Sequence, residues 1–154
     1  MKSALLDERD GLRTFAVVLG TGDEAMGALT EFAVKQHLRG SHFTAIGAFS
    51  RVVVAYFDWP SKAYRNLRID AQMEVLSFVG DISVEQDKPK VHAHVVVGKS
   101  DATAHGGHLV EGMVRPTLEI VVTETPRHLH RRFDPESGLA LIDPTSRTEE
   151  LQHD

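Results

Sequence analysis

Three histidines, His92, His94 and His108, have a spacing that can bring their imidazole rings together. They lie in the stretch VHAHVVVGKSDATAHGGHLVEG, residues 91–112, which holds four of the nine histidines in the chain. Alternate side chains of a β-strand point to the same face, so the first two histidines share the polar face of VHAHVVVG, about 7 Å apart by strand rise. Both rings can therefore reach one ion at the Zn–N bond length of ~2.0–2.1 Å.

The third histidine joins this pair only in one register of the predicted hairpin. The segment KSDATAHG predicts a turn that returns the chain as an antiparallel partner. If Val97 pairs with about His105, then His94 pairs with His108, and directly opposed residues share a face. A slip of one residue would place His108 on the core side instead. The glycines at 106–107 favour the cluster, because they permit close approach of the backbone at that point.

This cluster predicts a site for a divalent metal ion, zinc above all. The chain has no cysteine, so a metal must sit on histidine and carboxylate ligands, which suit borderline or hard ions. Three histidines with an open fourth position are also the arrangement by which catalytic zinc activates water. Two functions remain open: a binding or regulatory module, and a metal-dependent hydrolase or lyase.

The enzyme hypothesis needs a general base as well as the three ligands. Glu111 and Glu74 are the candidates, although Glu111 lies on the face opposite His108 if its strand is regular. No catalytic residue is assigned on this basis. We expect His105 to be exposed in the turn, and the second His-x-His pair, His128 and His130, has no third ligand near it in sequence.

Direct DNA binding is the least favoured function. The formal net charge of the chain is -5, and an acidic chain repels the phosphate backbone that nucleic-acid binding must neutralise. The one basic cluster, RHLHRRF at 127–133, is interpreted as a solvated segment. Its arginines, Arg127, Arg131 and Arg132, would have to supply the phosphate contacts.

The elements that position the histidines are mostly strands. RTFAVVLGTGD predicts a strand at about 14–19 and then a helix, capped by Asp23 and stopped by Gly40. Further strands are expected in HFTAIGAF and RVVVAYFDW, broken near Ser50, in QMEVLSFVGDISVEQDKPKVHAHVVVG around a turn at 85–89, and in GGHLVEGMV and PTLEIVVTET. This order predicts an α+β fold with a largely antiparallel sheet flanked by a few helices.

The length of 154 residues predicts a single domain. We place it at 1–133, followed by a flexible acidic tail at 134–154 whose one docking segment is LALI. No apolar run approaches the ~18 residues of a membrane span, and the start turns acidic before the apolar part of a signal peptide can form. We therefore expect a cytoplasmic protein without a membrane partner.

The succession MEVLSFVGDIS, PKVHAHVVVG and GGHLVEGMVRPTLEIVVTE resembles the PPC (plants and prokaryotes conserved) domain over about residues 12–126. The resemblance implies a compact α+β domain that assembles as a homotrimer. His92, His94 and His108 match the bacterial members of the family, in which they look like a metal site. Plant members carry an AT-hook before the domain. The Arg115–Pro116 dipeptide lacks the flanking Gly-Arg of that hook, so the chain resembles the stand-alone bacterial type.

A homotrimer would also cover the edges and the open face that a strand-rich chain leaves exposed. We expect part of one aromatic set to face a neighbouring subunit. A protein partner or a small ligand is compatible with the same surface. The aromatic set consists of Phe43, Phe49, Tyr56, Phe57 and Trp59.

Overall fold

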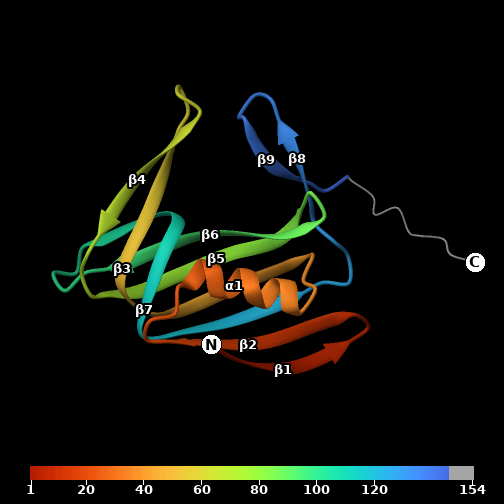
Figure 1. Ribbon diagram of the computed structural model, residues 1–154, viewed down its shortest axis with the longest axis horizontal. Helices are drawn as coiled ribbons and strands as arrows, with labels where there is room; N and C mark the ends of the chain where they lie inside the picture. The colour runs from red at the N-terminus through yellow and green to blue at the C-terminus, as the bar shows by residue number, and fades with distance from the viewer. Residues whose placement is uncertain (146–154) are drawn as a thin grey trace, which may run out of the picture.

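The computed structural model describes residues 1–145, and its strands form one mostly antiparallel sheet with a single helix among those residues (Figure 1). The antiparallel sheet is as expected. Of the few helices expected to flank the sheet, one is present among the described residues, so the fold is mostly β. The elements are β1 (Lys2–Arg9), β2 (Leu12–Gly20), α1 (Ala25–Lys35), β3 (Ser41–Asp58), β4 (Ala63–Ile69), β5 (Met73–Glu85), β6 (Lys88–Gly98), β7 (Ala104–Glu124), β8 (His130–Asp134) and β9 (Leu139–Asp143).

Four strands pair in a closed circuit. β3 pairs with β5, β5 with β6, β6 with β7, and β7 returns to β3, every pair being antiparallel. β1 and β2 extend the sheet beyond β7, β4 pairs with the second half of β3, and β8 joins the end of β5 through a parallel bridge. The circuit brings β6 and the start of β7 side by side, although a turn separates them in sequence.

Two long strands replace four shorter ones that the sequence predicts. β3 runs through Ser50 without a break, and β7 runs through Arg115–Pro116, which is a cis peptide. The breaks appear instead as irregularities in pairing, for example between Phe49 and Arg51. Such bulges let a strand bend and stay paired, and therefore a local disruption of the pattern does not end either strand.

The helix α1 packs on β6 and β7 and covers the inner face of these paired strands. Its N-cap is Glu24, whose side chain accepts from the backbone N–H groups of Met26 and Gly27 at 3.0 and 2.6 Å. Asp23, the expected cap, instead accepts from Gly20 N at 2.9 Å and closes the preceding turn. The helix buries one apolar face, formed by Ala25, Leu29, Phe32 and Ala33.

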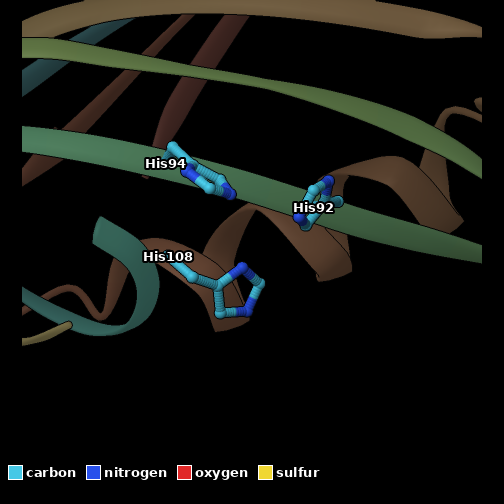
Figure 2. Close-up of side chains that lie close together, drawn as sticks. All are labelled: His92, His94 and His108. Atoms are coloured by element: carbon cyan, nitrogen blue, oxygen red, sulfur yellow. The ribbon is translucent and has the colours of Figure 1, made fainter. Parts of the chain in front are cut away.

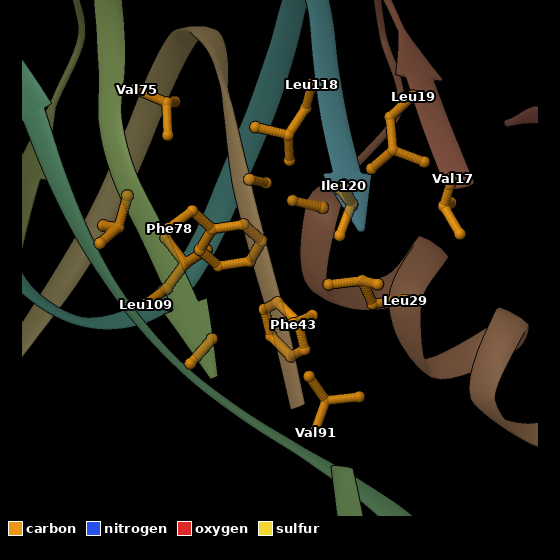
Figure 3. Packing of buried hydrophobic residues seen from close by; sticks show 14 of the residues in the cluster. Val17, Leu19, Leu29, Phe43, Val75, Phe78, Val91, Leu109, Leu118 and Ile120 are labelled. Carbon is orange, nitrogen blue, oxygen red and sulfur yellow. The ribbon is translucent and has the colours of Figure 1, made fainter. Parts of the chain in front are cut away.

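The hydrophobic core lies between the helix and the inner face of the sheet (Figure 3). Phe43 and Phe78, both fully buried, meet at its centre with ring centroids 5.2 Å apart. Of the aromatic set from the sequence, Phe43 and Phe49 are core residues, whereas Tyr56 and Trp59 are exposed. Only the exposed members remain candidates for contact with another subunit.

The expected domain boundary at residue 133 falls inside a β-hairpin. β8 and β9 pair antiparallel from His130 with Asp143 to Asp134 with Leu139, so the segment LALI forms a strand beside β8. The rest of the expected tail, 146–154, lies outside the described residues. Within residues 1–145, no helix is long and apolar enough to cross a membrane.

Candidate metal centre

The predicted register of the β6–β7 hairpin is confirmed. His94 pairs with His108 and Val97 with His105. On β6 the predicted core face, formed by Val91, Ala93, Val95 and Val97, is buried, and this leaves the two histidines of the strand on the other face. Figure 2 shows the third, His108, coming from β7 to meet them.

The glycines before His108 let three strands come together at this point. A Cβ on Gly106 would lie 2.6 Å from the carbonyl oxygen of Val95 on β6. A Cβ on Gly107 would lie 2.7 Å from the carbonyl oxygen of Ala55 on β3. Contacts this short do not occur in folded proteins, so a side chain at either position would push β7 away from a neighbour and displace His108.

The three imidazoles are close enough to share one ion. Their ring centroids are 5.1 Å apart for His92 and His108, 5.2 Å for His92 and His94, and 5.6 Å for His94 and His108. Each ring offers a nitrogen within 4.8 Å of those of the other two. A tetrahedral ion with Zn–N bonds of ~2.0–2.1 Å needs nitrogens about 3.4 Å apart, a spacing that small rotations of these rings can reach.

The surroundings of His94 and His108 lower the pKa of both and favour their neutral form, which is the form that binds a metal. Burial, reinforced by the neighbouring charges of His92, His94 and Lys90, lowers the pKa of His108 to about 4. Burial and then His92 also lower the pKa of His94. The Nδ1 atom of His108 is buried without a hydrogen-bond partner. Buried polar atoms are rarely left unpaired, so the donor set fits a metal ion.

Acidification of the metal-free protein should lower its free energy of unfolding between pH about 6.5 and about 4. In this window the unfolded chain protonates His108 at its ordinary pKa of 6.5, whereas the folded chain does not until about pH 4. The unfolded state then binds more protons than the folded state, so the free energy of unfolding decreases as the pH is lowered through this window. Urea denaturation at pH 7 and pH 4.5 measures this loss. His108→Phe should show a smaller loss, and an equal loss in both proteins would contradict the assignment.

A carboxylate that the sequence did not single out supports the cluster from β5. Asp81 is directly opposite His92 in the β5–β6 pairing, and its Oδ2 lies 3.4 Å from His92 Nδ1. Burial raises the pKa of Asp81, but hydrogen bonds from His92 and Arg131 outweigh it and leave the pKa below its ordinary value. In the structure the turn pairs Glu85 with Lys88, one residue shorter than the expected turn at 85–89. Counting back from the expected turn would have placed Asp81 opposite Ala93, so the sequence did not locate this contact.

Arg131 is not the solvated residue that the sequence predicts. Its side chain is only 9% exposed and donates from Nη2 to both oxygens of Asp81, at 2.8 and 3.0 Å. The interpretation of 127–133 as solvated is therefore wrong at Arg131 and holds at Arg132 and Phe133, whose side chains are exposed. The contact joins residues 50 apart in sequence, and no local pattern predicts it.

Neither candidate general base stands free beside the histidines. A register shift leaves Val110 unpaired, so Glu111 opposes Val53 while His108 opposes Ala55. This bulge places Glu111 on the same face as His108, and the expected opposite face is wrong because the strand is irregular there. The Glu111 carboxylate forms an ion pair with Arg51.

Three further features are Tyr64, Glu74 and the second histidine pair, of which Tyr64 contacts the cluster. Tyr64, from β4, lies against His108 with ring centroids 4.9 Å apart. Glu74 lies elsewhere, on the wall of a cavity of about 540 Å³ with Ile46 and Leu76. His128 and His130 have ring centroids 6.2 Å apart, and within residues 1–145 no third ligand joins them.

The fold and the site define a mostly antiparallel β protein with a three-histidine cluster on its outer face. A sequence model of the Plants and Prokaryotes Conserved (PCC) domain matches residues 6–126. The chain therefore belongs to this family, as its motifs predict. No curated protein matches the chain.

Solved structures resemble the chain over nearly its whole length. A plant- and prokaryote-conserved (PPC) protein from Pyrococcus horikoshii is 27% identical with a TM-score of 0.80, covering 95% of this chain and 97% of its own. A metal-containing protein from Archaeoglobus fulgidus is 32% identical with a TM-score of 0.78, covering 84% and 91%. A protein from Bacteroides thetaiotaomicron, provisionally named as DNA-binding, is 25% identical with a TM-score of 0.81, covering 92% and 96%.

Proposed function

We propose that this protein is a metal-binding PPC-family module that holds one divalent ion, zinc, on His92, His94 and His108. The observation that carries the proposal is the convergence of three imidazoles from two strands, each offering a nitrogen within 4.8 Å of the others. The similarity to a metal-containing archaeal protein supports it. All-histidine donor sets with neutral imidazoles suit zinc among the biological ions.

When bound, zinc would supply Lewis acidity at a fourth coordination position. Whether a reaction could follow at that position depends on the residues of the chain around it. His108 and His94 hold neutral nitrogens toward the ion, and Tyr64 covers one side of His108. Since Glu111 is engaged with Arg51 and Glu74 lines a separate cavity, the arrangement favours a binding or regulatory module over a hydrolase or lyase.

Two of the three arginines that DNA binding would need are already paired with carboxylates. Arg131 is buried against Asp81, and Arg132 pairs with Asp143 at 3.1 Å. The overall charge of -5 also opposes contact with phosphates. We therefore do not propose DNA binding for this chain, although the Bacteroides protein is provisionally named as DNA-binding.

The proposal includes a homotrimer built on the outer face of the sheet. Cross-strand pairing places Val79 of β5 beside His94 of β6. Thr44 of β3 lies on the other side of Val79, and Val121 of β7 lies beside Thr44. Apolar side chains exposed by 40% or more on this face are Val18, Ile46, Val79, Val96 and Val121. Apolar patches of this kind mark interaction sites, and a closed trimer would bury them. Light scattering that gives a mass of one 17.0 kDa chain would contradict the trimer.

Metal content of the purified protein tests the site itself. The wild-type protein, produced without a His-tag and without added metal, should contain about one zinc per chain, and His94→Ala should contain almost none. His94 is exposed, so its removal takes away a ligand and little packing. The matched control is His105→Ala, on the same hairpin but outside the cluster. Equal metal content in all three proteins would overturn the proposal.

A further inference from the structure

The buried guanidinium of Arg131 fastens the β8–β9 hairpin to the strand beside the histidine cluster. Its three nitrogens donate to three different groups. Nε donates to Ser83 Oγ at 2.7 Å, Nη1 to the Ala140 carbonyl at 2.9 Å, and Nη2 to the Asp81 carboxylate. One side chain thus joins β5, β8 and β9, and the planar fork of arginine fixes their relative positions.

Asp81 links Arg131 to the candidate ligand His92. The two residues are cross-strand partners, and the carboxylate oxygen Oδ2 faces His92 Nδ1 at 3.4 Å. An imidazole that donates Nδ1–H to a carboxylate keeps its lone pair on Nε2. Carboxylate partners of this kind orient metal-binding histidines and raise their basicity.

We infer that Arg131 is a positioning residue for the metal site and that docking of the β8–β9 hairpin is coupled to metal binding. The inference rests on the proposed metal-binding function. It assigns a role to a residue beyond the segment 6–126 that the family model matches. Arg131 holds Asp81 in place, Asp81 holds the Nδ1–H tautomer of His92, and that tautomer presents Nε2 to the ion.

The hairpin keeps other attachments when the Arg131 side chain is removed, so a substitution tests the side chain and not the whole hairpin. The Val84 amide donates to the Leu129 carbonyl at 2.7 Å, and the Leu129 amide donates to the Arg39 carbonyl at 2.9 Å. The Val84 amide therefore also reports hairpin docking by hydrogen exchange. Because coupling between two sites is reciprocal, zinc should slow exchange at this amide.

Zinc affinity, measured by competition with a chromophoric chelator, tests the inference. Arg131→Gln should bind zinc about 10–100-fold more weakly than the wild type, the range found for lost outer-shell partners. The matched control is Arg132→Gln, on the same strand, whose exposed side chain pairs only at the surface with Asp143. It should bind within about twofold of the wild type, as expected for an exposed ion pair.

A double-substitution cycle with Asp81→Asn separates positioning from a general loss of structure. If Arg131 acts through Asp81, the Asp81→Asn, Arg131→Gln protein should bind zinc no more weakly than Asp81→Asn alone. Nitrogen-15 NMR of the metal-free proteins gives a second readout. His92 should carry its proton on Nδ1 in the wild type and lose this preference in Arg131→Gln.

Different results would overturn the metal site and the positioning role of Arg131. Absence of zinc uptake by the wild type would overturn the metal site itself. Zinc uptake by the wild type with equal affinity in Arg131→Gln, or fully additive losses in the cycle, would overturn the positioning role alone. An unchanged His92 tautomer in Arg131→Gln would do the same.

Discussion

Glu124→Ala should lower the free energy of unfolding by about 3–5 kcal/mol, because it leaves several buried hydrogen-bond donors without their acceptor. The Glu124 side chain, on β7, is 4% exposed. It accepts from the backbone amides of Arg39 and Gly40 at 2.9 and 3.1 Å, and from the hydroxyl of Ser41. Alanine would leave these donors buried and unpaired, at a cost of about 1–3 kcal/mol for each group.

Urea denaturation with matched variants measures this effect. Glu124→Gln keeps an acceptor oxygen and should lose roughly half as much stability. The control is Glu119→Ala, an exposed position on the same strand, which should stay within about 0.5 kcal/mol of the wild type. A loss below about 1 kcal/mol for Glu124→Ala would show that water replaces the carboxylate and that the link from α1 to β3 does not depend on it.

The histidine register was predictable because two independent constraints agree. The alternation of VHAHVVVG fixes the core face of β6, and the short turn fixes which residue of β7 opposes it. A one-residue slip would have buried His108 and exposed Leu109, and Leu109 is in fact 1% exposed. Where local pattern and turn length both constrain a strand, the sequence alone predicts which three side chains lie together.

Features that depend on irregular pairing or on distant contacts could not be predicted in this way. The bulge at Val110 reverses the face of Glu111 without any mark in the residue pattern. β1 carries no buried residue along its whole length, so it lacks the alternation that would have revealed a strand. Arg131 sits in a basic, polar segment, and its burial depends on the packing of β8 against β5 and β9, which are distant or later in sequence.

Zinc at about 1,000 times its Kd should raise the free energy of unfolding of the wild type by about 4 kcal/mol. The folded chain presents three converged imidazoles, whereas the unfolded chain holds them apart, so the ion binds the folded state preferentially. Urea denaturation in the presence of zinc, and again with a chelator, measures the difference.

His94→Ala separates this stabilisation from any effect on the fold. The His94 side chain is exposed and fills no part of the core, so without metal the variant should unfold within about 0.5 kcal/mol of the wild type. With zinc, its free energy of unfolding should rise by only a small fraction of the wild-type increase, because the two remaining histidines bind zinc far more weakly. His105→Ala should keep the full increment. An equal zinc increment in the wild type and His94→Ala would mean that the ion binds elsewhere on the chain, and that the cluster of His92, His94 and His108 is not its site.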